Sequence, residues 1–174
     1  MVKANFKAIL LLLSLLCFIL PVSGDIYRLG PGDTIKISVY LEADLFFEGQ
    51  ISQQGSIDFP LIGSVVLQGF TQQEAKMYIE ERLKDGYLVS PNASVRIINY
   101  RPFFIYGEVR KPGSYPYQPN ITLEQAIVLA GGLKDRASRE QWTIQRGKKT
   151  NIFKASADTI LQPGDVIKVE KSFF

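Results

Sequence analysis

A Pro-Gly-Asp triplet occurs twice in the sequence, each time followed at once by a short stretch of alternating apolar and polar residues. The first copy reads GPGDTIKISV at residues 30–39, and the second reads QPGDVIKV at residues 162–169. In a type II turn, proline presets φ at the second position and glycine supplies the positive φ of the third. The following aspartate can then accept backbone N–H bonds within the turn. The sequence therefore predicts two structural turns, each directly followed by a strand. The first turn contains Pro31, Gly32 and Asp33, and the second contains Pro163, Gly164 and Asp165.

Two segments between the triplets carry the signature of a helix start. Thr71 and Glu74 form a predicted capping box, and an Asp-Gly pair ends the apolar stripe that follows. Thr122 and Gln125 form a second box, and a Gly-Gly pair ends that helix. Apolar spacing of i, i+3, i+4 and i+7 assigns both stripes to the core.

The remaining segments alternate apolar and polar residues and are predicted as strands. Three hairpins are expected: 48–59 turning at Gln54-Gly55, 103–117 turning at residues 111–114, and 142–153 turning around Gly147. From residue 103 onward the order is β-β-α-β-β-β, which predicts a β-grasp arrangement. The fold class is therefore α+β, with one unit at 25–101, a second at 102–174, and a joint at Arg101-Pro102, where proline removes a donor.

Residues 1–24 differ from the rest of the chain. Two lysines precede an apolar run from Ile9 to Val22, whose 14 residues would extend about 21 Å as a helix, less than the roughly 30 Å of a bilayer core. Val22-Ser23-Gly24 is typical of a secretory cleavage site. We predict a signal peptide that is cut between Gly24 and Asp25, and an uncleaved anchor is the alternative.

Cys17 is the only cysteine. A lipoprotein signal would place a small residue before the modified cysteine, but Leu16 precedes it and apolar residues follow. We expect Cys17 to leave with the signal peptide, and its lipidation stays open.

The composition argues against several classes of function. Beyond residue 24 the chain has 18 basic and 17 acidic residues, so no nucleic-acid partner is expected. Histidine, the commonest general base and metal ligand, is absent. No sequence feature pairs the acidic residues as a glycosidase would require. The sequence predicts no enzyme, no catalytic residues, no metal site and no cofactor.

Three tyrosines gather in the segment 103–117. Tyr106, Tyr115 and Tyr117 lie close in sequence to Arg110. Aromatic faces can contact sugar C–H groups, so these four residues are candidate glycan contacts. The alternative is that the tyrosines are half-buried strand positions with solvated hydroxyls.

The ordered series of these landmarks resembles one known family. YRLGPGDTIKISVY, GSIDFPLIGSVVLQGFTQQEAKMYIEERL and SPNASVRI resemble the N-terminal domain of bacterial polysaccharide biosynthesis/export proteins. IYGEVRKPGSYPYQPNITLEQAIVLAGGL and LQPGDVIKV resemble the SLBB (soluble ligand-binding β-grasp) domain that follows it in that family. The resemblance places the export domain at 25–101 and the SLBB domain at 102–174.

The resemblance implies polysaccharide export rather than catalysis. Members of the family form homo-oligomeric periplasmic rings that guide capsular polysaccharide or exopolysaccharide to the outer membrane, together with an inner-membrane polysaccharide co-polymerase. Long members add a further SLBB domain and a C-terminal amphipathic helix that lines a pore. We expect a short periplasmic subunit, associated with the outer membrane, that depends on a separate outer-membrane pore protein. A monomeric periplasmic glycan-binding or regulatory module is the alternative, and the identity of the polysaccharide stays open.

Overall fold

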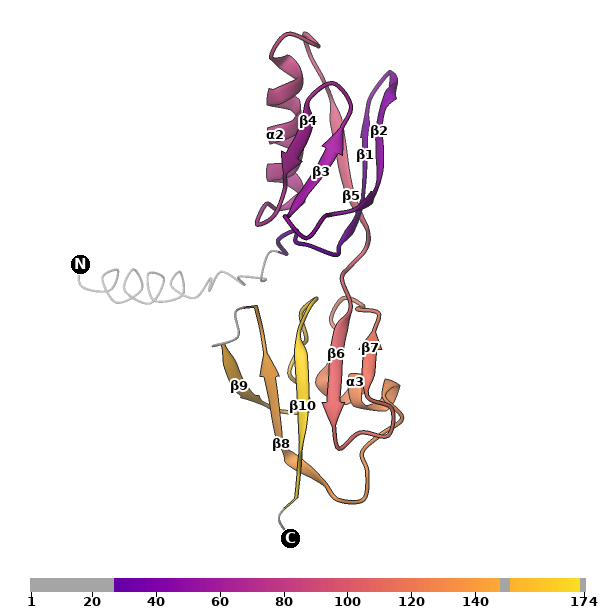
Figure 1. Cartoon of the computed structure of the whole chain (residues 1–174), viewed down its shortest axis with the longest axis vertical. Coiled ribbons are helices and arrows are strands. Elements are labelled where there is room, and N and C mark those ends of the chain that lie inside the picture. The colour runs from indigo at the N-terminus through magenta and orange to yellow at the C-terminus, as the bar shows by residue number, and fades with distance from the viewer. Residues whose placement is uncertain (1–26, 148–150, 173–174) are drawn as a thin grey trace, which may run out of the picture.

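The computed structural model describes residues 27–147 and 151–172. These residues form two bodies that lie end to end, each built from one helix and several strands, and a short segment after β5 joins them (Figure 1). The predicted signal peptide, Cys17 and the cleavage site at Gly24-Asp25 lie outside the described residues.

The first body contains one helix and two antiparallel sheets. A three-stranded sheet has the order β2-β1-β5, and β3 pairs with β4 in a separate two-stranded sheet. Helix α2 packs against β5. The elements are β1 (Thr34–Val39), β2 (Glu42–Gln50), β3 (Ser56–Phe59), β4 (Gly63–Val66), α2 (Gln72–Lys84) and β5 (Ala93–Asn99).

Helix α2 begins where the sequence predicts. The Thr71 hydroxyl accepts a bond from the Glu74 backbone N–H at 3.1 Å, and the Glu74 carboxylate accepts one from the Thr71 N–H at 2.8 Å. These two bonds satisfy donors that would otherwise have no partner at the helix start. The same reciprocal pair of bonds links Thr122 and Gln125 at the start of the second helix.

The second body is a five-stranded mixed sheet with one helix. Its strand order is β7-β6-β10-β8-β9, and the central β10 runs parallel to β6 and antiparallel to β8. The elements are β6 (Phe103–Gly107), β7 (Gly113–Tyr115), α3 (Leu123–Leu129), β8 (Ala137–Gln145), β9 (Ile152–Ala155) and β10 (Val166–Lys171). The predicted β-β-α-β-β-β order and the α+β class are confirmed, and the β-grasp assignment stays a prediction.

Each body buries its own apolar core. One cluster of buried side chains runs from Leu29 to Val95, and a second runs from Phe103 to Val169, with no member in common. The two clusters lie on either side of the predicted joint at Arg101-Pro102. The exact domain limits of 25–101 and 102–174 stay a prediction.

The predicted hairpin over residues 48–59 is wrong. Strand β2 pairs with β1, and β3 pairs with β4, so the chain passes from one sheet to another between them. A tight turn does form at the predicted place, because the Ser52 N–H donates to the Ser56 carbonyl at 2.9 Å. The strand before this turn already has β1 as its partner, since a short turn after Val39 brings β2 back beside β1.

The turn predicted at residues 111–114 is also misplaced. Phe103 lies opposite Tyr115 and Ile105 opposite Gly113, so Gly113 and Ser114 belong to strand β7. The connection at 108–112 is a wider loop held from outside the hairpin, because the Lys111 N–H donates to the Ala130 carbonyl at 2.8 Å. The third predicted hairpin is confirmed, since β8 and β9 pair on either side of Gly147.

Candidate functional site

The two Pro-Gly-Asp segments form the predicted turns. Gly32 has a φ of 92° and Gly164 a φ of 84°, the positive values that a type II turn requires. The Asp33 N–H donates to the Gly30 carbonyl at 3.2 Å, and the Asp165 N–H donates to the Gln162 carbonyl at 3.1 Å. These i to i+3 bonds close both turns.

Both turn aspartates are fully buried and fully paired. The Asp33 carboxylate accepts the Gly30 N–H at 2.8 Å, and the Asp165 carboxylate accepts the Gln162 N–H at 2.8 Å, as the turn chemistry predicts. Asp165 also binds both Nε and an Nη of Arg146, at 2.9 and 2.8 Å, inside the second body. The two turns therefore share one internal design, in which a buried carboxylate ties the turn to itself and to an arginine.

Arg101 joins the two turns. One Nη atom of its guanidinium lies 3.1 Å from the Asp33 carboxylate, and its Nε donates to the Pro163 carbonyl at 3.1 Å. Its own backbone N–H donates to Asp33 at 2.9 Å. The neighbouring Pro102 carbonyl accepts the Gly164 N–H at 3.2 Å. One residue of the connecting segment therefore binds a turn of each body.

A row of tyrosine rings runs beside Arg101. Tyr100 packs edge-on against Tyr27 with ring centroids 5.0 Å apart, and against Tyr117 at 5.4 Å. Burial, followed by the hydrogen bond to Asp33, raises the pKa of Tyr27 above its usual range. The neutral Tyr27 hydroxyl donates to Asp33 at 2.5 Å and accepts from Arg101 at 2.7 Å. The junction thus combines a buried polar network with aromatic packing from both bodies.

The tyrosines proposed as glycan contacts do not share one surface. Tyr106 is 47% exposed on β6, whereas Tyr115 stacks on the buried Phe103 at 5.9 Å and donates to the Lys111 carbonyl at 2.6 Å. Tyr117 belongs to the row at the junction and lines a hollow of about 470 Å³ beside it. Their contact with glycan stays a prediction, and packing explains Tyr115 and Tyr117.

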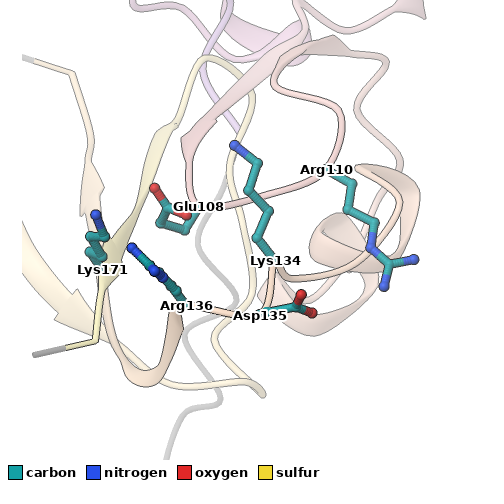
Figure 2. Close-up of a pocket in the computed structure, with 6 residues that line it drawn as sticks. All are labelled: Glu108, Arg110, Lys134, Asp135, Arg136 and Lys171. Carbon is teal, nitrogen blue, oxygen red and sulfur yellow. The ribbon is translucent and has the colours of Figure 1, made fainter. Parts of the chain in front are cut away.

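Arg110, the fourth candidate, lies apart from the row of tyrosine rings at the junction. It lines an open hollow at the carboxyl ends of β6 and β10 (Figure 2), whereas the turn at residues 163–165 directly precedes the amino end of β10. Sequence reasoning identified only Arg110 in this hollow. Within the described residues no group of three or more acidic side chains is placed to hold a metal ion.

Substituting the turn glycines tests the geometry of the junction. A Cβ at Gly32 would lie 3.3 Å from the Arg101 Cβ, and a Cβ at Gly164 would lie 2.8 Å from the Arg101 Nε. We expect Gly32→Val and Gly164→Val each to lower the free energy of unfolding by at least about 1 kcal/mol, because both also force valine into positive φ. Urea denaturation measures the loss, with Gly113→Val as control because its added Cβ meets no atom within 4 Å. Unchanged stability in both variants would contradict the turn assignment.

Comparisons with known proteins agree with this architecture. A family model described as polysaccharide biosynthesis/export protein matches residues 21–98, and a model of the SLBB domain matches residues 102–153. The exopolysaccharide production protein ExoF of Rhizobium meliloti is 33% identical over 123 residues, which are 64% of this chain and 29% of that protein.

Two further relatives carry names that refer to export or transport. The EPS I polysaccharide export outer membrane protein EpsA of Ralstonia nicotianae is 27% identical over 181 residues, covering 83% of this chain and 47% of EpsA. The polysialic acid transport protein KpsD of Escherichia coli is 27% identical over 128 residues, covering 71% of this chain and 23% of KpsD. The chain thus spans less than half the length of each of these relatives. The two family models follow one another along most of the chain in the order that the sequence predicted, and the chain belongs to the polysaccharide biosynthesis/export protein family.

Proposed function

We propose that this protein is a periplasmic subunit of a machine that exports capsular polysaccharide or exopolysaccharide. The observation that carries the proposal is the succession of an export domain and an SLBB domain, held together by Arg101. The names of the relatives support export as the process. The periplasmic location rests on the predicted signal peptide at residues 1–24.

In this proposal several copies assemble into a ring or collar around the path of the polymer. A closed ring needs subunits of constant shape, because each interface must repeat at the same angle. The junction supplies such constancy, since hydrogen bonds on both sides of Arg101 limit rotation between the two bodies. Among the described residues, β2 and β9 each lie at the edge of a sheet, where their backbone groups offer a place for a neighbouring copy to add a strand.

The machine would include two other proteins. An inner-membrane polysaccharide co-polymerase would deliver the polymer, and a separate outer-membrane pore protein would release it. No helix in the described parts of the chain has the length and apolar character needed to cross a bilayer. The protein itself would guide polymer without catalysing a reaction.

A deletion strain tests the proposed function. We expect deletion to abolish secreted polysaccharide while polymer accumulates inside the cell envelope, because synthesis continues without an exit. Both fractions should be measured by sugar analysis in the deletion strain and in a complemented strain. Normal secretion in the absence of any second copy of the gene would contradict export. Loss of polymer from both fractions would point to the alternative, a regulatory module.

The oligomeric state separates the ring from a monomeric glycan-binding module. Sedimentation of the purified protein at micromolar concentration should show a closed assembly of one size. A monomer across this range would contradict a ring built by this chain alone.

A further inference from the structure

An open hollow lies at the end of the second body that faces away from the junction. Its volume is about 440 Å³, within the size range of ordinary ligand sites. It lies where β6 and β10 end, and the segment that leads into β8 closes its other side (Figure 2). Four basic and two acidic side chains line it: Glu108, Arg110, Lys134, Asp135, Arg136 and Lys171.

The backbone around the hollow is held in place by hydrogen bonds. The Lys134 N–H donates to the Glu108 carbonyl at 3.0 Å, and the Arg110 N–H donates to the Gly132 carbonyl at 3.0 Å. The Ser172 N–H donates to the Arg136 carbonyl at 2.8 Å, which ties the end of β10 to the segment before β8. The basic side chains therefore project from a fixed frame that three separate segments of the chain build.

The charges of the hollow are not neutralised by one another. Among the described residues, none of the six lining side chains takes part in an ion pair within 4.0 Å. By contrast, Asp165 and Glu170 of the same body are paired, with Arg146 and Lys168. In Figure 2 the ends of Arg136 and Lys171 lie on one side of the hollow, and Lys134 extends over it from the other. The hollow keeps a net positive charge that a ligand can neutralise.

Charge is also divided unevenly along the chain. Residues 25–101 contain 7 basic and 10 acidic residues, whereas residues 102–174 contain 11 basic and 7 acidic residues. The net charge of residues 25–174 is close to zero, but residues 102–174 are basic. Four of the 11 basic side chains of residues 102–174 line the hollow. Such local charge attracts anions even when the net charge of the protein is small.

We propose that this hollow binds carboxylate groups of an acidic polysaccharide. The inference rests on the proposed function, which supplies a glycan as substrate, and adds that the glycan carries negative charge. Lysine ammonium groups and arginine guanidinium groups are the donors that proteins use for carboxylates. The hollow lies on the SLBB side of the molecule, far from the aromatic residues of the junction.

The lining argues against a protein partner at this place. The centres of protein interfaces are depleted of charged residues and enriched in aromatic anchors. All six lining residues are charged, and none is aromatic. An open site with charges on flexible stems instead suits a polymer that must be held and then released, because conduction requires contacts weak enough to leave.

Binding of a carboxylated trisaccharide tests the inference. The probes are trigalacturonate, the matching neutral trisaccharide of galactose, and inorganic phosphate, each titrated calorimetrically into the purified protein at about 0.15 M salt, where the Debye length is about 8 Å. We expect trigalacturonate to bind and the neutral sugar not to bind. The variant Lys134→Gln/Lys171→Gln should weaken the affinity about tenfold, because two charge-assisted contacts are lost.

A matched variant controls for net charge. Lys84→Gln/Lys154→Gln removes two exposed lysines that lie outside the hollow, so its net charge equals that of the Lys134→Gln/Lys171→Gln variant. It should bind trigalacturonate within about twofold of the unmodified protein, because distant exposed charges are largely screened. Glu108→Gln/Asp135→Asn should bind more tightly, since it removes the two negative charges that line the hollow.

Four outcomes of the titrations would overturn the inference. These are no binding of trigalacturonate, equal binding of the neutral trisaccharide, equal loss in both double-lysine variants, and phosphate binding as tight as that of the trisaccharide. Self-association that the Lys134→Gln/Lys171→Gln variant abolishes would show instead that a second copy occupies the hollow. If trigalacturonate fails to bind but the deletion strain still retains polymer, the proposed carboxylate site is wrong, whereas the proposed export function is supported. Binding with normal secretion after deletion would reject export alone.

Discussion

Asp33→Ala is expected to lower the free energy of unfolding by about 3 kcal/mol, because it removes one side of a buried ion pair. The Asp33 side chain is fully buried and holds four donors: the N–H groups of Gly30 and Arg101, the Arg101 guanidinium and the Tyr27 hydroxyl. Alanine would leave all four without this acceptor. Urea denaturation followed by circular dichroism measures the loss.

A double-mutant cycle assigns this loss to the junction. Arg101→Met removes the guanidinium and keeps most of the apolar stem, and the Asp33→Ala/Arg101→Met pair should lose clearly less than the sum of the single changes. Asp44→Ala, at an exposed position of β2, should leave stability unchanged within about 0.5 kcal/mol. Strict additivity of the two junction variants would show that Asp33 and Arg101 act independently, against the arrangement described above.

Gly107→Ala is expected to destabilise the second body by at least about 3 kcal/mol, since backbone strain, a steric clash and a lost hydrogen bond combine. Gly107 has a φ of 95°, and a Cβ there would lie 2.2 Å from the Val169 carbonyl oxygen. That oxygen accepts the Glu108 N–H at 3.0 Å, so the clash falls on the pairing of β6 with β10. Thermal unfolding, with the fluorescence of Trp142 as a probe of this body, measures the loss.

Gly113→Ala is the matched control for Gly107→Ala. Both glycines lie in paired strands of the same hairpin, but a Cβ at Gly113 meets no atom within 4 Å. The control should therefore keep its stability within about 0.5 kcal/mol. Equal stability of the two variants would mean that β6 and β10 do not approach each other as closely as described.

Local sequence signals predicted those parts of the fold that depend on neighbouring residues. The capping boxes at Thr71 and Thr122 and the two Pro-Gly-Asp turns are each formed within a few residues, so their chemistry can be read directly. The same holds for the amphipathic faces of both helices. The order of elements in the second body followed from these signals alone.

Local sequence signals could not predict which strands pair when their segments lie far apart in the sequence. The sequence marked a turn near Gly55, and a turn is there, but it did not reveal that β2 already has β1 as its partner. The register of a strand depends on which face must be buried and on which partner strand is available. The residues of the turn specify neither. The hairpin expected over residues 48–59 failed for this reason.

Arg101 was the most consequential residue that sequence reasoning missed. The sequence marked it only as the residue before Pro102, a position with restricted backbone angles. Its partners Asp33 and Pro163 lie 68 and 62 positions away, so no local pattern indicates the contacts. The basic hollow was missed for a similar reason, because its six residues come from three separate segments.

The contact between Arg101 and the Pro163 carbonyl has a consequence for how such chains diversify. Arg101 binds the first body through a side chain, Asp33, but reaches the second through a main-chain oxygen. A carbonyl is present whatever residue occupies the position, so any sequence that makes the same turn offers the same acceptor. A second domain that keeps the shape of this turn therefore keeps the acceptor for Arg101, whereas the packing of Tyr117 on Tyr100 also requires an aromatic side chain.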